Sequence, residues 1–167
     1  MKVERVACDA MIDPATPADL PDLLRLEEAC FSAPWTRKMF EAELTGNQFA
    51  RFLIARQRDL ETTTLTVVGY FCFWVVFEEV RLMNLAVTEA ARRRGIATRF
   101  VSQALQTGRE QGAVRAVLEV RVSNHAAVAL YRKLGFRRVA TRAQYYANPI
   151  EDAVLMEMEP ICIQSPA

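Results

Sequence analysis

The stretch from Asn84 to Phe100, NLAVTEAARRRGIATRF, decides how the rest of the chain is interpreted. A strand predicted over 80–87 ends in this stretch at Val87, and a short polar loop follows. From Gly95 to Gln111 apolar residues recur at i, i+1, i+4 and i+5, which predicts an amphipathic helix that Gly112 ends. The first amides of a helix lack internal partners and carry the positive end of its dipole. This junction of strand, loop and helix is therefore a candidate anion site.

Three arginines, Arg92, Arg93 and Arg94, stand immediately before Gly95. A diphosphate would gain both backbone contacts and charge-assisted contacts at such a site. The loop is not a Walker sequence, because no Gly-Lys-Ser/Thr follows, and it lacks the G-x-G-x-x-G of dinucleotide folds. Taken alone, it leaves a second interpretation open, in which Gly95 only permits a turn and the arginines form a solvated surface run.

Outward from this junction, the chain alternates between helical and extended patterns and predicts a mixed α/β domain. The predicted helices span 19–30, 36–45, 95–111 and 124–134, and the predicted strands span 49–58, 67–77, 80–87, 114–122, 136–145 and 154–159. Short polar breaks between the first three strands favour antiparallel neighbours. No repeat or long linker interrupts the chain, so we expect one domain at 11–160, an uncertain segment at 1–10 and a tail at 161–167.

Composition excludes several classes of protein. With 51% hydrophobic and 25% charged residues and a net charge of +1 over 167 residues, the chain resembles an average globular domain. It is unlike disordered or collagen-like chains, and its charge gives no broad footprint for nucleic acid. The longest apolar stretch, 67–77, is too short for a membrane span. Residues 1–10 lack the apolar core of a secretory signal, which favours a cytoplasmic protein.

Cysteine and histidine usage limits the chemistry further. No C-x-x-C pair occurs, so we expect buried free thiols and neither disulfides nor a zinc site. His125 is the single histidine and excludes a multi-histidine metal centre. We therefore expect no metal, and a carboxylate as general base. The cysteines are Cys8, Cys30, Cys72 and Cys162.

The segment from Arg92 to Ala97 resembles the R/Q-x-x-G-x-G/A pyrophosphate loop of the GCN5-related N-acetyltransferase (GNAT) family. Four other stretches are similar to the bacterial RimI group: LEEACFSAPWT at 26–36, LEVRVSNHAAVALYRKLGF at 118–136, and the later YY and EDAVLM. Members of that group acetylate the N-terminal alanine of ribosomal protein bS18. The likeness extends over 14–159, with Ala97 where a second glycine is frequent. It implies a single three-layer α/β/α domain with a mostly antiparallel, splayed central sheet, and acetyl-CoA as co-substrate.

The resemblance also implies roles for individual side chains. Strand alternation places Glu119 on the face opposite Leu118 and Val120, and the family has its general base at this glutamate of LEVR. From the residues alone, Glu119 is equally an outward-facing glutamate paired with Arg121 or Arg115. The family's tyrosine of LYxxLGF, here Tyr131, protonates the coenzyme sulfur, although a tyrosine at this spacing is more often part of a core. Asn124 caps the following helix, contacts the coenzyme, or does both.

The remaining expected site residues form two sets. In this superfamily the strand that ends at Val87 carries a bulge and splays from the strand with Glu119. Trp35 also stands with Phe40 at the ends of a hydrophobic staple. The residues expected to bind the coenzyme are Leu85, Ala86, Val87, Arg92, Arg93, Arg94, Gly95, Ile96, Ala97, Thr98 and Asn124. Those expected to line the acceptor side are Trp35, Glu79, Tyr145 and Tyr146.

The protonation of the acceptor favours an N-terminal amine. At pH 7 a lysine side chain costs ~4.6 kcal/mol to deprotonate, whereas an α-amine costs ~1.1 kcal/mol. A single carboxylate base suits the second better. The leading hypothesis is direct acetyl transfer to the N-terminal alanine of bS18, with no membrane or nucleic-acid partner. The alternatives are a wider set of N-termini, a small-molecule amine, or a module that binds acyl-CoA without chemistry.

Overall fold

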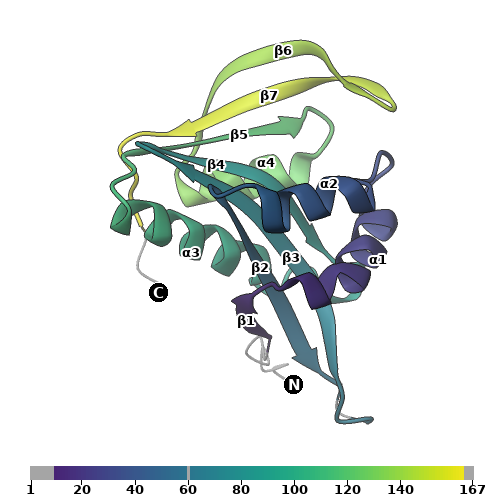
Figure 1. Ribbon diagram of the computed structural model, residues 1–167. Helices are drawn as coiled ribbons and strands as arrows, with labels where there is room; N and C mark the ends of the chain where they lie inside the picture. The colour runs from purple at the N-terminus through teal and green to yellow at the C-terminus, as the bar shows by residue number, and fades with distance from the viewer. Residues whose placement is uncertain (1–9, 60, 164–167) are drawn as a thin grey trace, which may run out of the picture.

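The computed structural model describes residues 10–59 and 61–163. These residues form a seven-stranded sheet in the order β1-β2-β3-β4-β5-β7-β6 (Figure 1). The strands are β1 (Met11–Pro14), β2 (Ala50–Arg58), β3 (Leu65–Val76), β4 (Glu79–Val87), β5 (Arg115–Arg121), β6 (Arg137–Ala147) and β7 (Ile150–Met158). Only β4 and β5 pair in parallel among these strands, and the other neighbours are antiparallel. The prediction of a mostly antiparallel mixed sheet is confirmed.

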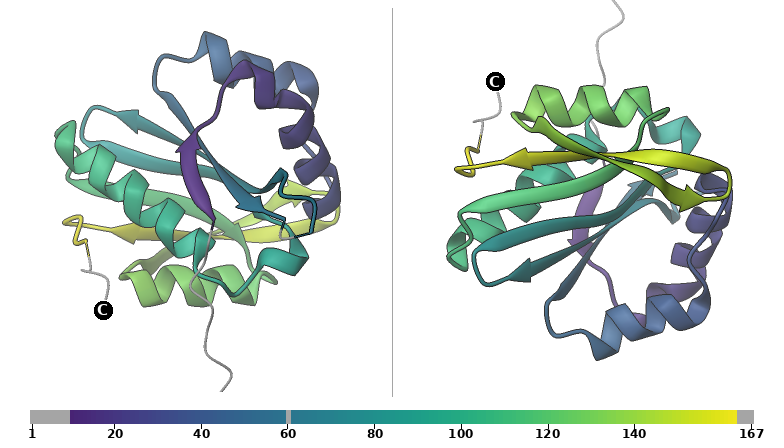
Figure 2. Two further views of the ribbon diagram at one scale, coloured as in Figure 1. Left: turned by 90° about the horizontal axis from the view of Figure 1, so that it is seen from below. Right: turned by 90° about the horizontal axis from the view of Figure 1, so that it is seen from above.

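Helices cover both faces of the sheet. They are α1 (Leu20–Cys30), α2 (Arg37–Glu41), α3 (Ile96–Glu110) and α4 (His125–Leu134). Helices α1 and α2 lie on one face, and α3 and α4 lie on the other (Figures 1 and 2). Strand β3 shows the division, because Tyr70 and Cys72 pack with α1, while Phe71 and Phe73 pack with α3. The predicted three-layer arrangement is confirmed.

Local sequence signals explain where the first two helices begin. The Asp19 carboxylate accepts a hydrogen bond from the Thr16 amide at 2.8 Å, and this pair forms a capping box ahead of α1. The Thr36 hydroxyl accepts one from the Met39 amide at 3.3 Å at the start of α2. The rings of Trp35 and Phe40 pack edge to face with centroids 5.4 Å apart, as expected for a hydrophobic staple.

Several predicted boundaries differ from the structure. Strand β1 was not predicted. Strand β7 begins at Ile150 instead of residue 154, because the adjacent polar residues Glu151 and Asp152 hide its apolar alternation. Helix α2 ends at Glu41, and the chain continues as a π-helical turn over Ala42–Gly46. Ile161 is buried, and its amide bonds to the Val114 carbonyl at 2.9 Å, so the packed chain continues past the boundary predicted at residue 160.

The cysteine prediction holds only in part. Cys30, Cys72 and Cys162 are free thiols. Cys72 is buried and Cys30 is half-buried, but Cys162 is exposed because it follows the last strand, so the prediction of burial is wrong there. Cys8 lies outside the described residues. None of the described helices is long and apolar enough to cross a membrane.

Candidate active site

The candidate site is a cavity of about 1460 Å³ that opens where β4 and β5 separate. The two strands pair in parallel only from Glu79 with Arg115 to Leu82 with Leu118. Directly after Leu82, Met83 is an extra residue in the ladder with β3, since Cys72 pairs with Asn84 and Phe73 with Leu82. The bulge and the splay implied by the resemblance therefore occur together, and they open the sheet beside Glu119.

The loop before α3 forms one end of this cavity. Gly95 precedes the helix with a left-handed φ of 82°, and the first internal amide bond runs from Arg99 to the Gly95 carbonyl at 3.0 Å. The amides of residues 96–98 therefore stand free of the helical ladder at its positive end. Arg93, Gly95, Ile96, Ala97 and Thr98 line the cavity.

The three arginines of this loop have different surroundings. Arg92 lines the cavity, but its Nε donates to the Val87 carbonyl at 2.9 Å, so this side chain ties the loop to the end of β4. Arg93 has a positive φ of 61° and lines the cavity. Arg94 is not among the lining residues. The structure thus brings Arg92 and Arg93 to the cavity but not Arg94.

Glu119 lies on β5, one residue beyond the last pair with β4. Its side chain is 18% exposed, and its Oε1 lies 3.0 Å from Arg142 Nη1 of β6 in an ion pair. The alternative partners weighed from the sequence are wrong, because Arg121 pairs with Glu151 at 3.2 Å and Arg115 with Glu79 at 2.8 Å. A hydrogen bond to Glu119 also raises the pKa of the Tyr145 hydroxyl.

Tyr131 and Asn124 approach the cavity from α4. Tyr131 is 8% exposed, and its ring packs edge to face on Phe136 with centroids 5.7 Å apart. Burial raises its pKa to about 12, so the phenol keeps its proton at neutral pH. Asn124 caps the helix, with Oδ1 accepting from the Ala127 amide at 3.2 Å, and it also lines the cavity.

The acceptor side contains three of the four residues expected there. Trp35, Tyr145 and Tyr146 line the cavity, and so do Leu85, Ala86 and Val87 of β4. Glu79 does not line it. It begins β4 at the paired end of the strands, where its carboxylate binds Arg81 and Arg115 at 2.8 Å each. The expected contact of Glu79 with an acceptor is not supported by this position.

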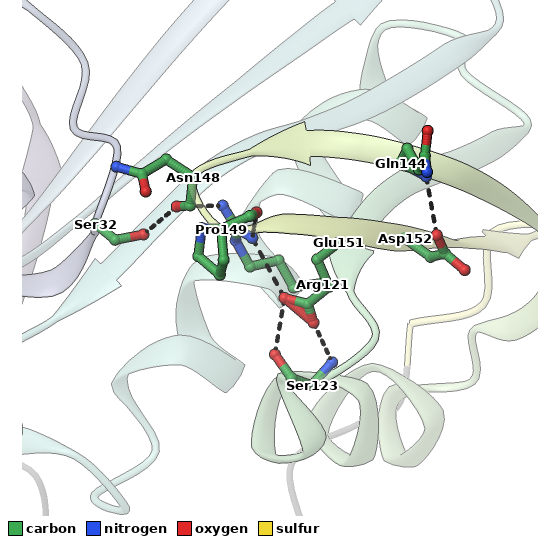
Figure 3. Close-up of polar contacts among 8 residues, drawn as sticks. All are labelled: Ser32, Arg121, Ser123, Gln144, Asn148, Pro149, Glu151 and Asp152. Atoms are coloured by element: carbon green, nitrogen blue, oxygen red, sulfur yellow. Dashed lines mark hydrogen bonds and ion pairs between the residues drawn. The ribbon is translucent and has the colours of Figure 1, made fainter.

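A network of polar contacts fixes the turn between β6 and β7 beside the cavity (Figure 3). Arg121 donates to the Asn148 carbonyl at 3.2 Å and pairs with Glu151 at 3.2 Å. Glu151 also accepts from the amide and hydroxyl of Ser123, and these hydrogen bonds lower its pKa. Ser32, after α1, donates to the same Asn148 carbonyl at 2.7 Å. The network joins the end of β5 to both segments that flank the acceptor side.

The model of the acetyltransferase (GNAT) family matches residues 20–136, which is more than half of the chain. The chain belongs to the GNAT family. It is 35% identical over 143 residues to the [ribosomal protein bS18]-alanine N-acetyltransferase of Salmonella typhimurium, covering 84% of this chain and 90% of that one. It is 31% identical over 138 residues to a putative enzyme of the same name from Bacillus subtilis, covering 83% and 87%.

A solved structure supports the same assignment. The ribosomal-protein-S18-alanine N-acetyltransferase of Escherichia coli superposes with a TM-score of 0.78 at 27% identity, covering 93% of this chain and 96% of that one. The GNAT fold and the RimI-type resemblance predicted from the sequence are confirmed.

The geometry of this GNAT cavity fits acetyl-CoA, the co-substrate of the family. The free amides of residues 96–98 and the Arg93 guanidinium suit a diphosphate. The exposed edge of β4 after the bulge leaves backbone groups of Leu85 and Ala86 for an amide-rich arm, because β5 no longer pairs there. The volume of about 1460 Å³ accommodates a ligand of this size together with the end of an acceptor.

Gly95→Ala tests the loop. A Cβ at Gly95 meets nothing within 4 Å, so the cost comes from the left-handed backbone alone. An L-residue with this φ costs ~1–2 kcal/mol, so the free loop relaxes away from this conformation and must regain it on binding. We therefore expect affinity for acetyl-CoA to fall about tenfold. Isothermal titration calorimetry measures it. Gly46→Ala, which also meets nothing within 4 Å and has no positive φ, is the matched control, and equal affinities of the two variants would contradict this role of the loop.

One polar cluster that borders the cavity was not predicted from the sequence. Glu27 of α1 is 1% exposed and contacts Trp35, Tyr70 and Asn84. A signal was present, because Glu27 follows Leu20 and Leu23 at helical spacing and so falls on the apolar face of α1. A carboxylate at a core-facing position requires partners, and two of them, Tyr70 and Asn84, lie far away along the chain.

Proposed function

We propose that this protein transfers the acetyl group of acetyl-CoA to the N-terminal α-amine of ribosomal protein bS18, at its alanine. The observation that carries the proposal is 35% identity to a [ribosomal protein bS18]-alanine N-acetyltransferase over 84% of the chain, with the Glu119 carboxylate at the splay of β4 and β5. The acceptor terminus enters between Trp35 and Tyr145, on the face of the sheet that carries Glu119.

Acetyl-CoA supplies an activated acetyl group as a thioester. Glu119 accepts the proton that the ammonium of the acceptor must lose before it becomes a nucleophile, directly or through water. Tyr131 holds a proton on its hydroxyl at neutral pH and donates it to the departing sulfur. The groups thus flank the line of attack, with the base on β5 and the acid on α4.

The ion pair of Glu119 with Arg142 bears on how the acceptor is received. Arg142 is half exposed on the edge strand β6, so its guanidinium has room to move when an ammonium approaches the same carboxylate. The low cost of deprotonating an α-amine, ~1.1 kcal/mol at pH 7 against ~4.6 kcal/mol for lysine, favours an N-terminus over a side chain.

The test compares three acceptors with wild-type protein. An alanine-initiated peptide with the bS18 N-terminal sequence, the same peptide with a blocked N-terminus and an internal lysine, and a polyamine are each incubated with acetyl-CoA. Thiol release gives the rate, and mass spectrometry locates the acetyl group. We expect acetylation of the alanine amine, with kcat/KM highest for the first peptide. Preferential acetylation of the polyamine or of the lysine would overturn the proposal.

A further inference from the structure

Glu27 is a buried carboxylate surrounded by hydrogen-bond donors from three other segments. Its Oε1 accepts from the Trp35 amide at 2.8 Å, and both of its oxygens accept from the Asn84 amide nitrogen at 3.1 Å. The Tyr70 hydroxyl donates to Oε2 and itself accepts from Asn84 at 2.7 Å. One side chain of α1 therefore holds β3, β4 and the segment that precedes α2.

This arrangement is costly and so requires an explanation. Burial raises the pKa of Glu27, and the ion pairs among the described residues do not include it. A buried carboxylate with only neutral donors is weak evidence for stability, since an apolar residue of similar volume often serves as well. The position of Glu27 suggests a role other than stability, because Glu27 also lines the cavity.

The partner on β4 lies directly after the bulge at Met83. A bulge shifts the strand by one residue, and that shift decides which side chains face each side of the sheet. In the observed register Asn84 faces α1. Ala86 also packs with α1, whereas Val87 packs with α3. A slip of one residue would turn the Asn84 amide into the apolar layer under α3. The hydrogen bonds to Glu27 therefore oppose that slip.

The second partner lies on the acceptor side. The Trp35 amide is held by Glu27, and the Trp35 ring lines the cavity. A single carboxylate thus fixes both the strand that offers its backbone to the coenzyme and the segment that borders the acceptor. We propose that Glu27 is a positioning residue for acetyl transfer, which sets the register of β4 after its bulge and the place of Trp35 relative to Glu119.

The inference rests on the proposed acetyl transfer, and its test uses Glu27→Gln, which keeps the size of the side chain and removes its charge. We expect kcat/KM for the acceptor to fall about 10- to 100-fold, since small displacements of reacting groups have effects of this size. Affinity for acetyl-CoA, set mainly at the start of α3, should change less than threefold. Asn84→Ala should produce the same pattern, and the double variant should lose no more than the larger single loss.

Asp19→Asn is the matched control. Asp19 is a second mostly buried carboxylate at the start of α1, where it accepts from the Thr16 amide at 2.8 Å and pairs with Arg56 at 2.6 Å, and it does not line the cavity. We expect this variant to lower thermal stability and leave kcat/KM unchanged. If Glu27→Gln does the same, with kinetics unchanged where both variants are folded, Glu27 is merely structural and the inference is wrong.

Two further measurements keep the inference testable. Tyr70→Phe leaves Glu27 three of its four hydrogen bonds. This variant replaces Glu27→Gln in the test if Glu27→Gln does not fold. We expect it to lower kcat/KM in the same direction but by less. Hydrogen exchange of the amides of residues 83–87 needs no activity, and we expect it to rise in Glu27→Gln more than elsewhere in the sheet. Unchanged exchange there would contradict the inference, whereas an inactive wild type contradicts the proposed function alone.

Discussion

Glu119→Gln should lower kcat for an alanine-initiated peptide by about 10²- to 10⁴-fold, the usual contribution of a general base. The amide of glutamine matches the carboxylate in shape but does not accept the proton of the ammonium. Affinity for acetyl-CoA should stay close to the wild-type value, because the candidate diphosphate site lies at the start of α3 and not on β5. Steady-state kinetics with saturating coenzyme, together with calorimetry, separate the two effects.

The ion pair with Arg142 adds a second expectation for this variant. Glutamine loses the pairing at 3.0 Å, so Arg142 is released, and unfolding must be measured to exclude a loss of folded protein. We expect little change in stability, because Arg142 is half exposed and such pairs contribute little. Glu110→Gln at the exposed end of α3 is the control. A kcat for Glu119→Gln within twofold of wild type would remove Glu119 as the base.

Tyr131→Phe should lower kcat by about 10²-fold, at the low end for general acid catalysis. The effect should be smaller than that of Glu119→Gln because a thiol, with a pKa of ~8.5, is already a tolerable leaving group without a proton. Phenylalanine preserves the edge-to-face packing on Phe136, so the fold should persist. Unaltered turnover would show that Tyr131 only fills the core.

The pH profile gives an independent test of Tyr131. Burial raises its pKa to about 12, above the ordinary value of 10.0. The phenol therefore stays protonated as the pH rises through 10, and the wild-type kcat should show no alkaline decline from this group before the pH approaches 12. A decline centred near pH 10 that disappears in Tyr131→Phe would contradict the raised pKa while supporting the role as acid.

The elements around the coenzyme loop were predictable because their signals are local. Gly95 and the apolar spacing of α3 are recognisable from neighbouring residues alone. The same is true of the cap of α4 at Asn124. The bulge and splay of β4 followed only from the family resemblance, since nothing in the sequence of the strand marks an extra residue at Met83. The sequence also did not show that Glu79 lies where β4 and β5 are paired, away from the cavity.

Partners of the site residues were harder to predict because they come from distant strands. Glu119 pairs with Arg142 across the intervening strand β7, a relation fixed by the sheet order and not by sequence spacing. The same holds for Glu27, whose partners Tyr70 and Asn84 are 43 and 57 residues away. The contact of Arg92 with the Val87 carbonyl depends on how the loop folds back on β4, which sequence spacing does not show.

Binding of acetyl-CoA in this cavity, with its diphosphate at the start of α3, underlies every role assigned above. It is measured by calorimetric titration of the purified wild-type protein with acetyl-CoA. We expect saturable binding of one coenzyme per chain, competed by CoA and weakened in Gly95→Ala but not in Gly46→Ala. Absence of any affinity for acetyl-CoA and CoA would show that the cavity is not a coenzyme site.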